Sequence, residues 1–254
     1  MIVFERIVKA ILQNGEFIFC FQSYQRILEF NLKYFKIKIM NLEKLYEIIR
    51  TSKYSNSHGS GDARLFYAGL APMYFSLIYS MISKKCVCLG SGDGFVPKLM
   101  VYAQSQLIKE KLISDYNVTL VDANLSGWGD RFYGDFIEGY PEINIINEKT
   151  DDAAQSFDNI SYLHIDADHS GPQVYKDLCN YGNRMQKNCW AITCHDTCHY
   201  NHTIEVYDSV KRWAKEMNHD LVNFPVGMGT ALIMPKHYHK YGTDFFCYKL
   251  LGTE

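Results

Sequence analysis

The feature that most constrains this chain is an alternation of short apolar segments with helical stretches. Short β-like segments recur at 84–90, 117–123, 142–147, 160–168 and 189–196. Helical stretches separate several of them, at 96–112 and 172–186. Strands that are apolar on both faces and alternate with helices are typical of a parallel sheet covered by helices. The alternation therefore predicts an α/β fold built on a parallel sheet.

The end of this region follows a different pattern. A helical stretch at 203–217 precedes two strand-like segments, 220–228 and 229–235, joined by a short glycine-containing link. A short link of this kind predicts an antiparallel hairpin. We expect a Rossmann-like, doubly wound, mostly parallel seven-stranded sheet that ends in a C-terminal antiparallel hairpin.

Composition excludes several classes of partner. The 254 residues are 47% apolar and 21% charged, and Lys plus Arg number 26 against 28 Asp plus Glu. A net charge of −2 gives no overall positive field to hold nucleic acid or an anionic membrane. Residues 65–82 are uncharged, but they include Gly69, Pro72 and several Tyr and Ser residues, so we expect a buried helix there and no membrane span.

The first part of the chain predicts an appendage. Residues 1–39 are aromatic-rich and show no clean period, and they offer a means of association into a homo-oligomer. Asn41 is placed to cap a helix with an apolar face. Residues 51–64 are polar and rich in Gly and Ser, which favours a solvated linker over a lid. We expect an N-terminal helical extension and linker over 1–64 and a second domain over 65–254.

The eight cysteines indicate a reducing compartment. Most lie within apolar stretches of a long chain, so we interpret them as buried thiols and not as a disulfide framework. Glu5, Arg6 and Lys9 interrupt the first apolar stretch, which argues against a secretory signal. We expect a cytoplasmic protein.

A glycine-rich turn follows the first strand. Gly90, Ser91, Gly92 and Gly94 lead directly into a helix, which is where a doubly wound sheet binds a nucleotide-like ligand. The spacing is G-x-G-x-G; the dinucleotide fingerprint would need glycine in place of Phe95. Asp122 ends the next strand, with Ala123 after it, and its carboxylate is placed to bind a ribose diol. The pattern favours ligand binding over a simple tight turn.

Acidic and imidazole groups follow two later strands. Asp166, Asp168 and His169 end one, and His195 with Asp196 ends the next. The carboxyl ends of parallel strands lie at one edge of a sheet, so we expect these groups to converge near the glycine turn. Carboxylates favour a hard cation such as Mg²⁺, and histidine admits Mn²⁺ or Zn²⁺. Capping by Asp196 and a core hydrogen bond from His169 are the structural alternatives.

These motifs resemble a known family over roughly 84–235. VCLGSGDG, Asp122, YLHIDADHSGPQVYKDL, TCHDT and FPVGMGTALI are similar to class I S-adenosylmethionine (SAM)-dependent methyltransferases. The closest resemblance is to the branch of sugar O-methyltransferases and cephalosporin-hydroxylase-like proteins. Cys88 departs from the family's acidic residue before the glycines, and Asn188-Cys189 from its Gly-Gly turn. His195-Asp196 stands where related catechol-type enzymes carry Asp-Asn.

The resemblance implies a SAM-dependent methyltransferase domain over 65–254 that methylates a hydroxyl of a small molecule or sugar. The implied cofactor-binding residues are Gly90, Ser91, Gly92, Gly94, Asp122, Ala123, Thr150 and Asp151. Asp166, His195 and Asp196 fall at the metal positions, for Mg²⁺ or Mn²⁺. Asp166, His169 and His195 are the implied catalytic residues, with Asp166 as a ligand and His169 as the favoured base.

Other classes of protein share parts of this pattern. Asp166-x-Asp168 is also the metal motif of nucleotide-sugar transferases, although those folds do not need the glycine turn. A nicotinamide oxidoreductase would use such a turn, but with the other glycine spacing. A non-catalytic zinc-binding interaction protein is the third alternative, and its ligands would come from Cys194, His195, Cys198, His199 and His202.

Overall fold

The structure is a computed structural model that describes residues 40–60, 69–90, 94–123, 139–198 and 204–236. All the elements below lie within 41–240, which form one compact unit. Several expectations fall on residues outside the described ranges. They concern the 1–39 extension, Ser91, Gly92, His199 and His202.

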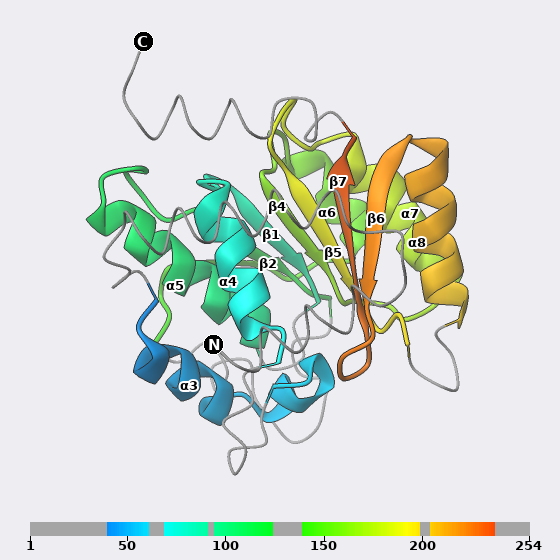
Figure 1. Cartoon of the computed structure of the whole chain (residues 1–254). Coiled ribbons are helices and arrows are strands. Elements are labelled where there is room, and N and C mark those ends of the chain that lie inside the picture. The colour runs from blue at the N-terminus through cyan, green and yellow to red at the C-terminus, as the bar shows by residue number, and fades with distance from the viewer. Residues whose placement is uncertain (1–39, 61–68, 91–93, 124–138, 199–203, 237–254) are drawn as a thin grey trace. The chain divides into compact units, whose positions relative to one another are not determined.

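A seven-stranded sheet forms the centre of this unit (Figure 1), with strand order β3-β2-β1-β4-β5-β7-β6. The strands are β1 (Cys86–Leu89), β2 (Val118–Val121), β3 (Ile143–Ile146), β4 (Tyr162–Ile165), β5 (Ala191–His195), β6 (His219–Phe224) and β7 (Thr230–Pro235). Strands β1 to β5 pair in parallel, and β7 pairs antiparallel with both β5 and β6. The predicted Rossmann-like sheet with a C-terminal hairpin is confirmed.

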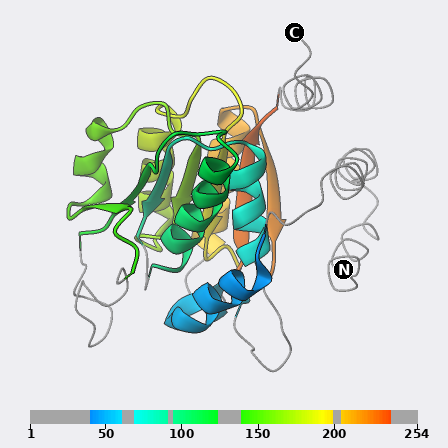
Figure 2. The same ribbon diagram turned by 90° about the vertical axis from the view of Figure 1, so that its left-hand side faces the viewer.

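Helices cover both faces of the sheet. They are α3 (Leu42–Thr51), α4 (Ala71–Ser80), α5 (Phe95–Lys109), α6 (Thr150–Ala153), α7 (Gly171–Gly182) and α8 (Ile204–Glu216), with short 3₁₀ helices η1 (Lys53–His58) and η2 (Ala154–Ser156). Helices α4 and α5 lie on one face, and α7 and α8 lie on the other (Figures 1 and 2). As predicted, Asn41 caps α3, where its Oδ1 accepts a hydrogen bond from the Glu43 N–H at 2.9 Å.

Alternation along β4 and β5 sorts their side chains between the two faces. Leu163, Ile165, Ile192 and Cys194 pack into the hydrophobic cluster under α7 and α8. The residues between them face the α4 side, where Tyr162 and His164 both hydrogen-bond to Thr193 Oγ1 at 2.8 Å. Polar and imidazole groups therefore gather on the α4 side of the sheet, close to its carboxyl edge.

The segment 52–60 is not the solvated linker that its composition predicts. Ser52, Ser55, His58 and Ser60 are all buried. The Met228 N–H donates a hydrogen bond to the Ser57 carbonyl at 2.7 Å, which joins this segment to the turn between β6 and β7. Gly227 has φ +64°, and a Cβ there would lie 2.1 Å from the Ser57 oxygen. Close backbone contact thus gives a polar, glycine-rich sequence a fixed place in the core.

In the part of the chain that the structure describes, the uncharged 65–82 region contributes α4, which covers only Ala71–Ser80. None of the described helices combines the length and apolar character that crossing a bilayer requires. The expectation of a buried helix there is consistent with α4, in which Tyr74 and Ile78 are fully buried. The proposed division of the chain at residue 64 stays a prediction.

Candidate functional site

Gly90 begins the site at the carboxyl end of β1. It has φ +71°, a left-handed conformation that glycine adopts without a steric penalty. A Cβ at this position would lie 2.2 Å from the Asp166 backbone oxygen. The turn after β1 therefore packs directly against the backbone that follows β4. Gly94, with φ +80°, caps the start of α5.

Two other groups of predicted cofactor residues follow β2 and β3. Asp122 is partly buried directly after β2, and its N–H donates to the Ile146 carbonyl at 3.1 Å; Ala123 beside it is exposed. Thr150 and Asp151 begin α6 and contact α7: Thr150 Oγ1 donates to Asp177 at 2.6 Å, and Asp151 pairs with Lys176 at 2.7 Å. Asp122 thus lies at the same edge as Gly90, whereas the described contacts of Thr150 and Asp151 are with α7.

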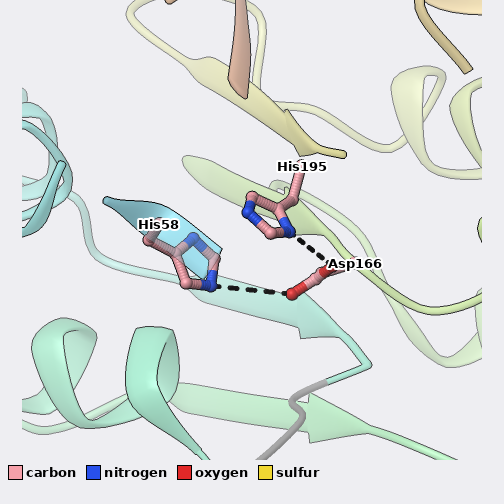
Figure 3. Close-up of side chains that lie close together, drawn as sticks. All are labelled: His58, Asp166 and His195. Atoms are coloured by element: carbon pink, nitrogen blue, oxygen red, sulfur yellow. Dashed lines mark hydrogen bonds and ion pairs between the residues drawn. The ribbon is translucent and has the colours of Figure 1, made fainter. Parts of the chain in front are cut away.

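Asp166, directly after β4, is the centre of the second group. His195 Nδ1 lies 3.0 Å from its Oδ1, and His169 Nε2 lies 3.5 Å from the same oxygen. His58 Nε2 lies 3.8 Å from Oδ2 (Figure 3), and His164 Nε2 lies 3.9 Å from it. The structure therefore brings the predicted Asp166, His169 and His195 together. It adds two histidines that were not predicted.

Asp196 joins this group through His169 and His195. Its Oδ2 lies 2.9 Å from His169 Nδ1, and its Oδ1 lies 3.4 Å from His195 Nδ1. Hydrogen bonds to Asp166 and Asp196 outweigh burial and raise the pKa of His169 to about 10. A ring that is protonated at neutral pH donates hydrogen bonds and does not accept a proton. This argues against the expectation that His169 is the general base.

Burial and charge divide the remaining ionisable groups into two kinds. Burial lowers the pKa of His58, helped by the charge of His195, and burial also lowers the pKa of His164. Burial would lower the pKa of His195 too, but the charge and hydrogen bond of Asp166 outweigh it and raise that pKa. Burial alone would raise the pKa of Asp166; the charge of His195 and the other imidazoles close to the carboxylate hold it well below its usual range. His58 and His164 are neutral rings, and Asp166 and His195 form a charged pair.

The structure gives no support to the two metal motifs of the alternative functions. Asp168 is exposed, and its Oδ1 accepts the Ser170 N–H at 2.8 Å before α7 instead of facing the Asp166 group. Cys194 packs in the hydrophobic cluster on the α7 side of the sheet, whereas His195 faces Asp166. Cys194 and His195 do not share a site, because consecutive residues of a strand point to opposite faces.

His58 and His164 were missed for different reasons. His164 stands two residues before Asp166, so the period of a strand places both side chains on one face. That signal was present in the motif YLHIDADH. His58 lies in a polar, glycine-rich stretch that carries no periodic signal, and only the folded chain brings it to Asp166. Its ring stacks on that of His195 with 3.9 Å between centroids.

Comparisons with known proteins agree with the observed fold. Residues 87–197 match a family model described as a methyltransferase domain. No curated protein sequence matches the chain. An O-methyltransferase from Streptomyces achromogenes involved in tomaymycin synthesis, solved with SAM, is similar in structure. It has a TM-score of 0.54 and 9% identity, over 82% of this chain and 96% of that one.

Two further solved structures are similar at the same level. An O-methyltransferase from Bacillus cereus in complex with SAH has a TM-score of 0.53 and 10% identity, over 78% of this chain and 93% of that one. An SAH-bound methyltransferase from Podospora anserina has a TM-score of 0.52 and 9% identity, over 85% and 96% of the two chains. Identities this low show a shared fold. The family model itself runs from β1 to Thr197, so the part of the chain that matches a methyltransferase domain includes the glycine turn, Asp166 and His195.

Proposed function

We propose that this enzyme transfers the methyl group of SAM to a hydroxyl oxygen of a small molecule or sugar. The observation that carries the proposal is the convergence of two groups of residues at one sheet edge. Gly90 and Asp122 follow β1 and β2, and the Asp166 group follows β4 and β5. Gly90 and Asp166 are in backbone contact. A cofactor on the first group and an acceptor on the second would therefore meet at neighbouring strands.

The first group suits the cofactor. Gly90 leaves the space that a nucleoside-type ligand needs to approach the backbone, and Asp122 offers a carboxylate for the ribose diol. Gly94 opens α5 behind them. We assign Ser91, Gly92, Ala123, Thr150 and Asp151 to the same binding region on the strength of the family resemblance. Similar folds from Streptomyces achromogenes and Bacillus cereus were solved with SAM and SAH, which favours this ligand.

The second group suits a proton-bearing acceptor. In the transfer, the bond between sulfur and methyl breaks as an oxygen–methyl bond forms, SAH leaves, and the hydroxyl proton passes to a base. Asp166 keeps an unprotonated carboxylate at the edge of the sheet, and its side chain is 12% exposed. We assign the proton to the carboxylate of Asp166, with His195 as the cation paired with it. His169, as a cation, then serves as a hydrogen-bond donor. Most of the rate gain in such a reaction comes from positioning.

A divalent cation fits the second group. Asp166 Oδ1 and Asp196 Oδ1 lie 3.0 and 3.4 Å from His195 Nδ1. Asp166, His169 and Asp196 form a group of closely spaced ligand atoms. Two carboxylates gathered with imidazoles are a donor set that holds Mg²⁺, Mn²⁺ or a similar ion. When bound, such an ion would lower the pKa of an acceptor hydroxyl.

The remaining expectations follow from the rest of the chain. Among the described residues, Cys86, Cys88, Cys179, Cys189, Cys194 and Cys198 form no disulfides, as expected in a reducing cytoplasm. The net charge of −2 disfavours nucleic acid and anionic membrane as partners. Association of copies through residues 1–39 stays a prediction.

Calorimetry with SAM and a methyl-transfer assay test the proposal together. We expect SAM to bind the full-length protein. Asp122→Ala should weaken binding by at least tenfold, because each charge-assisted hydrogen bond contributes roughly 1.5–3 kcal/mol. Asp115→Ala, an exposed carboxylate between α5 and β2, is the matched control. Absence of SAM binding in the wild type would reject the proposed function, and unchanged affinity in Asp122→Ala would reject only the role of Asp122.

The acceptor and the cation are tested by transfer from labelled SAM to a panel of hydroxylated compounds. Diols should be better acceptors than matched mono-ols if a cation chelates two oxygens. Activity should fall in EDTA and return with an added divalent ion. Asp196→Asn should prevent the recovery and leave SAM affinity intact. Full activity in excess EDTA would mean that the acidic and imidazole groups act without a metal.

A further inference from the structure

Three buried histidines are arranged alike around Asp166. In each ring one nitrogen contacts an outer partner, and the other faces the carboxylate. The outer contacts are His58 Nδ1 with Tyr74 Oη at 3.0 Å, His164 Nδ1 with Thr193 Oγ1 at 2.8 Å, and His195 Nε2 with the Ser57 carbonyl at 3.1 Å. Metal-binding histidines typically have one nitrogen on the ion and the other hydrogen-bonded to an outer group. The arrangement has the form of a metal centre.

The distances to Asp166 support the same interpretation. His58 Nε2 and His164 Nε2 lie 3.8 and 3.9 Å from Oδ2, which is too long for direct hydrogen bonds. His195 Nδ1 lies 3.0 Å from Oδ1. Atoms that share one ion through bonds of about 2.0–2.1 Å are separated by roughly 3 to 4 Å. The candidate ligand atoms of His58, Asp166 and His195 all lie within 4.8 Å of one another.

His164 supplies an independent observation. Its side chain is fully buried, and its Nε2 has no hydrogen-bond partner among the residues that the structure describes. Burying an imidazole nitrogen without a partner is unfavourable. The unsatisfied nitrogen points to the same carboxylate oxygen as His58 Nε2. An ion bound beside Oδ2 would give this nitrogen a partner.

The donor types decide which ion this centre prefers. Imidazole nitrogens suit Zn²⁺ and its first-row neighbours, whereas Mg²⁺ takes oxygen ligands. We propose that His58, His164, His195 and Asp166 bind one imidazole-seeking transition-metal ion, represented by Zn²⁺, in preference to Mg²⁺. The centre shares Asp166 and His195 with the proposed function, on which its catalytic meaning rests, but it uses His58 and His164 in place of Asp196.

Such a centre also has a structural consequence. His58 belongs to η1, whereas His164 belongs to β4 and His195 to β5. An ion held by all three would join the N-terminal segment to the sheet edge over the site. Because a ligand that binds only the folded state stabilises it by mass action, Zn²⁺ should raise the melting temperature of the full-length protein.

Metal binding is measured without SAM or acceptor. The full-length protein is treated with chelator and titrated calorimetrically with ZnCl₂ and, separately, with MgCl₂. We expect Zn²⁺ to bind at least about 100-fold more tightly than Mg²⁺. X-ray absorption at the zinc edge of the wild-type protein should then show three imidazole ligands. Equal affinities for the two ions, or a spectrum with fewer than three imidazoles, would overturn the proposal.

Variants identify the ligands. His58→Gln and His164→Gln should each weaken Zn²⁺ binding by more than the roughly 10- to 100-fold that loss of an outer partner costs, and Tyr74→Phe should fall within that range. His219→Gln is the matched control, because this ring lies on β6 against Trp190 and Trp213. Wild-type affinity in both His58→Gln and His164→Gln would overturn the proposal. If a variant does not fold, the wild-type zinc spectrum still decides.

The two proposals can fail separately. Zinc binding by three imidazoles without any SAM binding would leave the metal centre standing and reject the methyltransferase proposal. SAM binding and methyl transfer without a preference for Zn²⁺ over Mg²⁺ would support the methyltransferase proposal and overturn the metal centre.

Discussion

The carboxyl edge of the sheet contains two regions that are built in different ways. In the proposed cofactor region, Gly90, Gly94 and Asp122 each lie within a few residues of the strand that positions them. In the histidine region, the contacts span the chain, and His195 Nε2 binds a carbonyl 138 residues away. A local motif can encode the first region, whereas the second exists only after η1 packs against the β6–β7 turn. The two regions should therefore respond differently to substitution.

The largest effect is expected where the two regions meet, at Gly90. Gly90→Ala would place a Cβ 2.2 Å from the Asp166 oxygen and 2.5 Å from Ala167 Cα, in a left-handed backbone conformation. Both neighbours are backbone atoms that cannot move aside cheaply. We expect a loss of more than about 4 kcal/mol in the free energy of unfolding, measured by urea denaturation.

Gly139→Ala separates the two causes of the stability loss expected in Gly90→Ala, which are the steric clash and the positive φ. Gly139 also has positive φ, +80°, but a Cβ there would meet nothing within 4 Å. Only the conformational cost of roughly 1–2 kcal/mol should appear. If Gly90→Ala costs no more than Gly139→Ala, the two regions are not packed against each other as the structure has them.

Most of the fold could be predicted from the sequence because its signals are local. Apolar strands alternating with helices, the Asn41 cap and the glycine-containing hairpin each gave the observed element within a few residues. The segment 52–60 could not be predicted in this way. Its Ser and Gly residues are typical of solvent-exposed loops, and its burial depends on backbone contacts with Gly227 and Met228 that no short window of sequence contains.

The residues of the site also divide into those that the sequence could predict and those that it could not. Asp166, His169, His195 and Asp196 follow neighbouring strands, so topology alone brings them together. The same argument could have predicted His164, since its side chain lies on the same face as that of Asp166. His58 was not, because its place depends on tertiary packing against Tyr74 and Phe95. The positive charge on His169 could not be predicted either, because it depends on Asp166 and Asp196, which are 30 residues apart in the sequence.

A second comparison concerns two buried carboxylates: Asp166, which has imidazole partners, and Asp177, which accepts hydrogen bonds from Thr150 and Gln173. Asp177 on α7 is fully buried, and burial raises its pKa to about 6 despite hydrogen bonds from Thr150 and Gln173. The folded state then binds the proton more tightly than the unfolded state. Stability is present below the unfolded pKa of about 3.9 and falls as pH rises toward 6. Asp177→Asn should remove this fall, which amounts to at most about 3 kcal/mol.

Urea denaturation between about pH 4 and pH 7.5 measures the difference between wild type and Asp177→Asn. The variant should gain stability relative to the wild type as pH rises. Asp151→Asn is the matched control, because the hydrogen bond from Lys176 lowers the pKa of Asp151. Its carboxylate stays ionised above the unfolded pKa of about 3.9, so the stability difference between this variant and the wild type should stay nearly constant over the same range. Parallel pH profiles for Asp177→Asn and wild type would show that Asp177 does not titrate as its burial implies.

The smallest effect sharpens the distinction between Asp166 and Asp168, which share one motif but differ in surroundings. Asp168 is exposed and accepts the Ser170 N–H at 2.8 Å before α7, so Asp168→Ala should cost about 1 kcal/mol of unfolding free energy through loss of this local cap. Zn²⁺ affinity should not change, because Asp168 does not face the histidines. Asp166→Asn should instead abolish tight Zn²⁺ binding, since a neutral amide replaces the carboxylate that all of them face. Weakened Zn²⁺ binding in Asp168→Ala, with its stability unchanged, would place both carboxylates of the motif in the ion site.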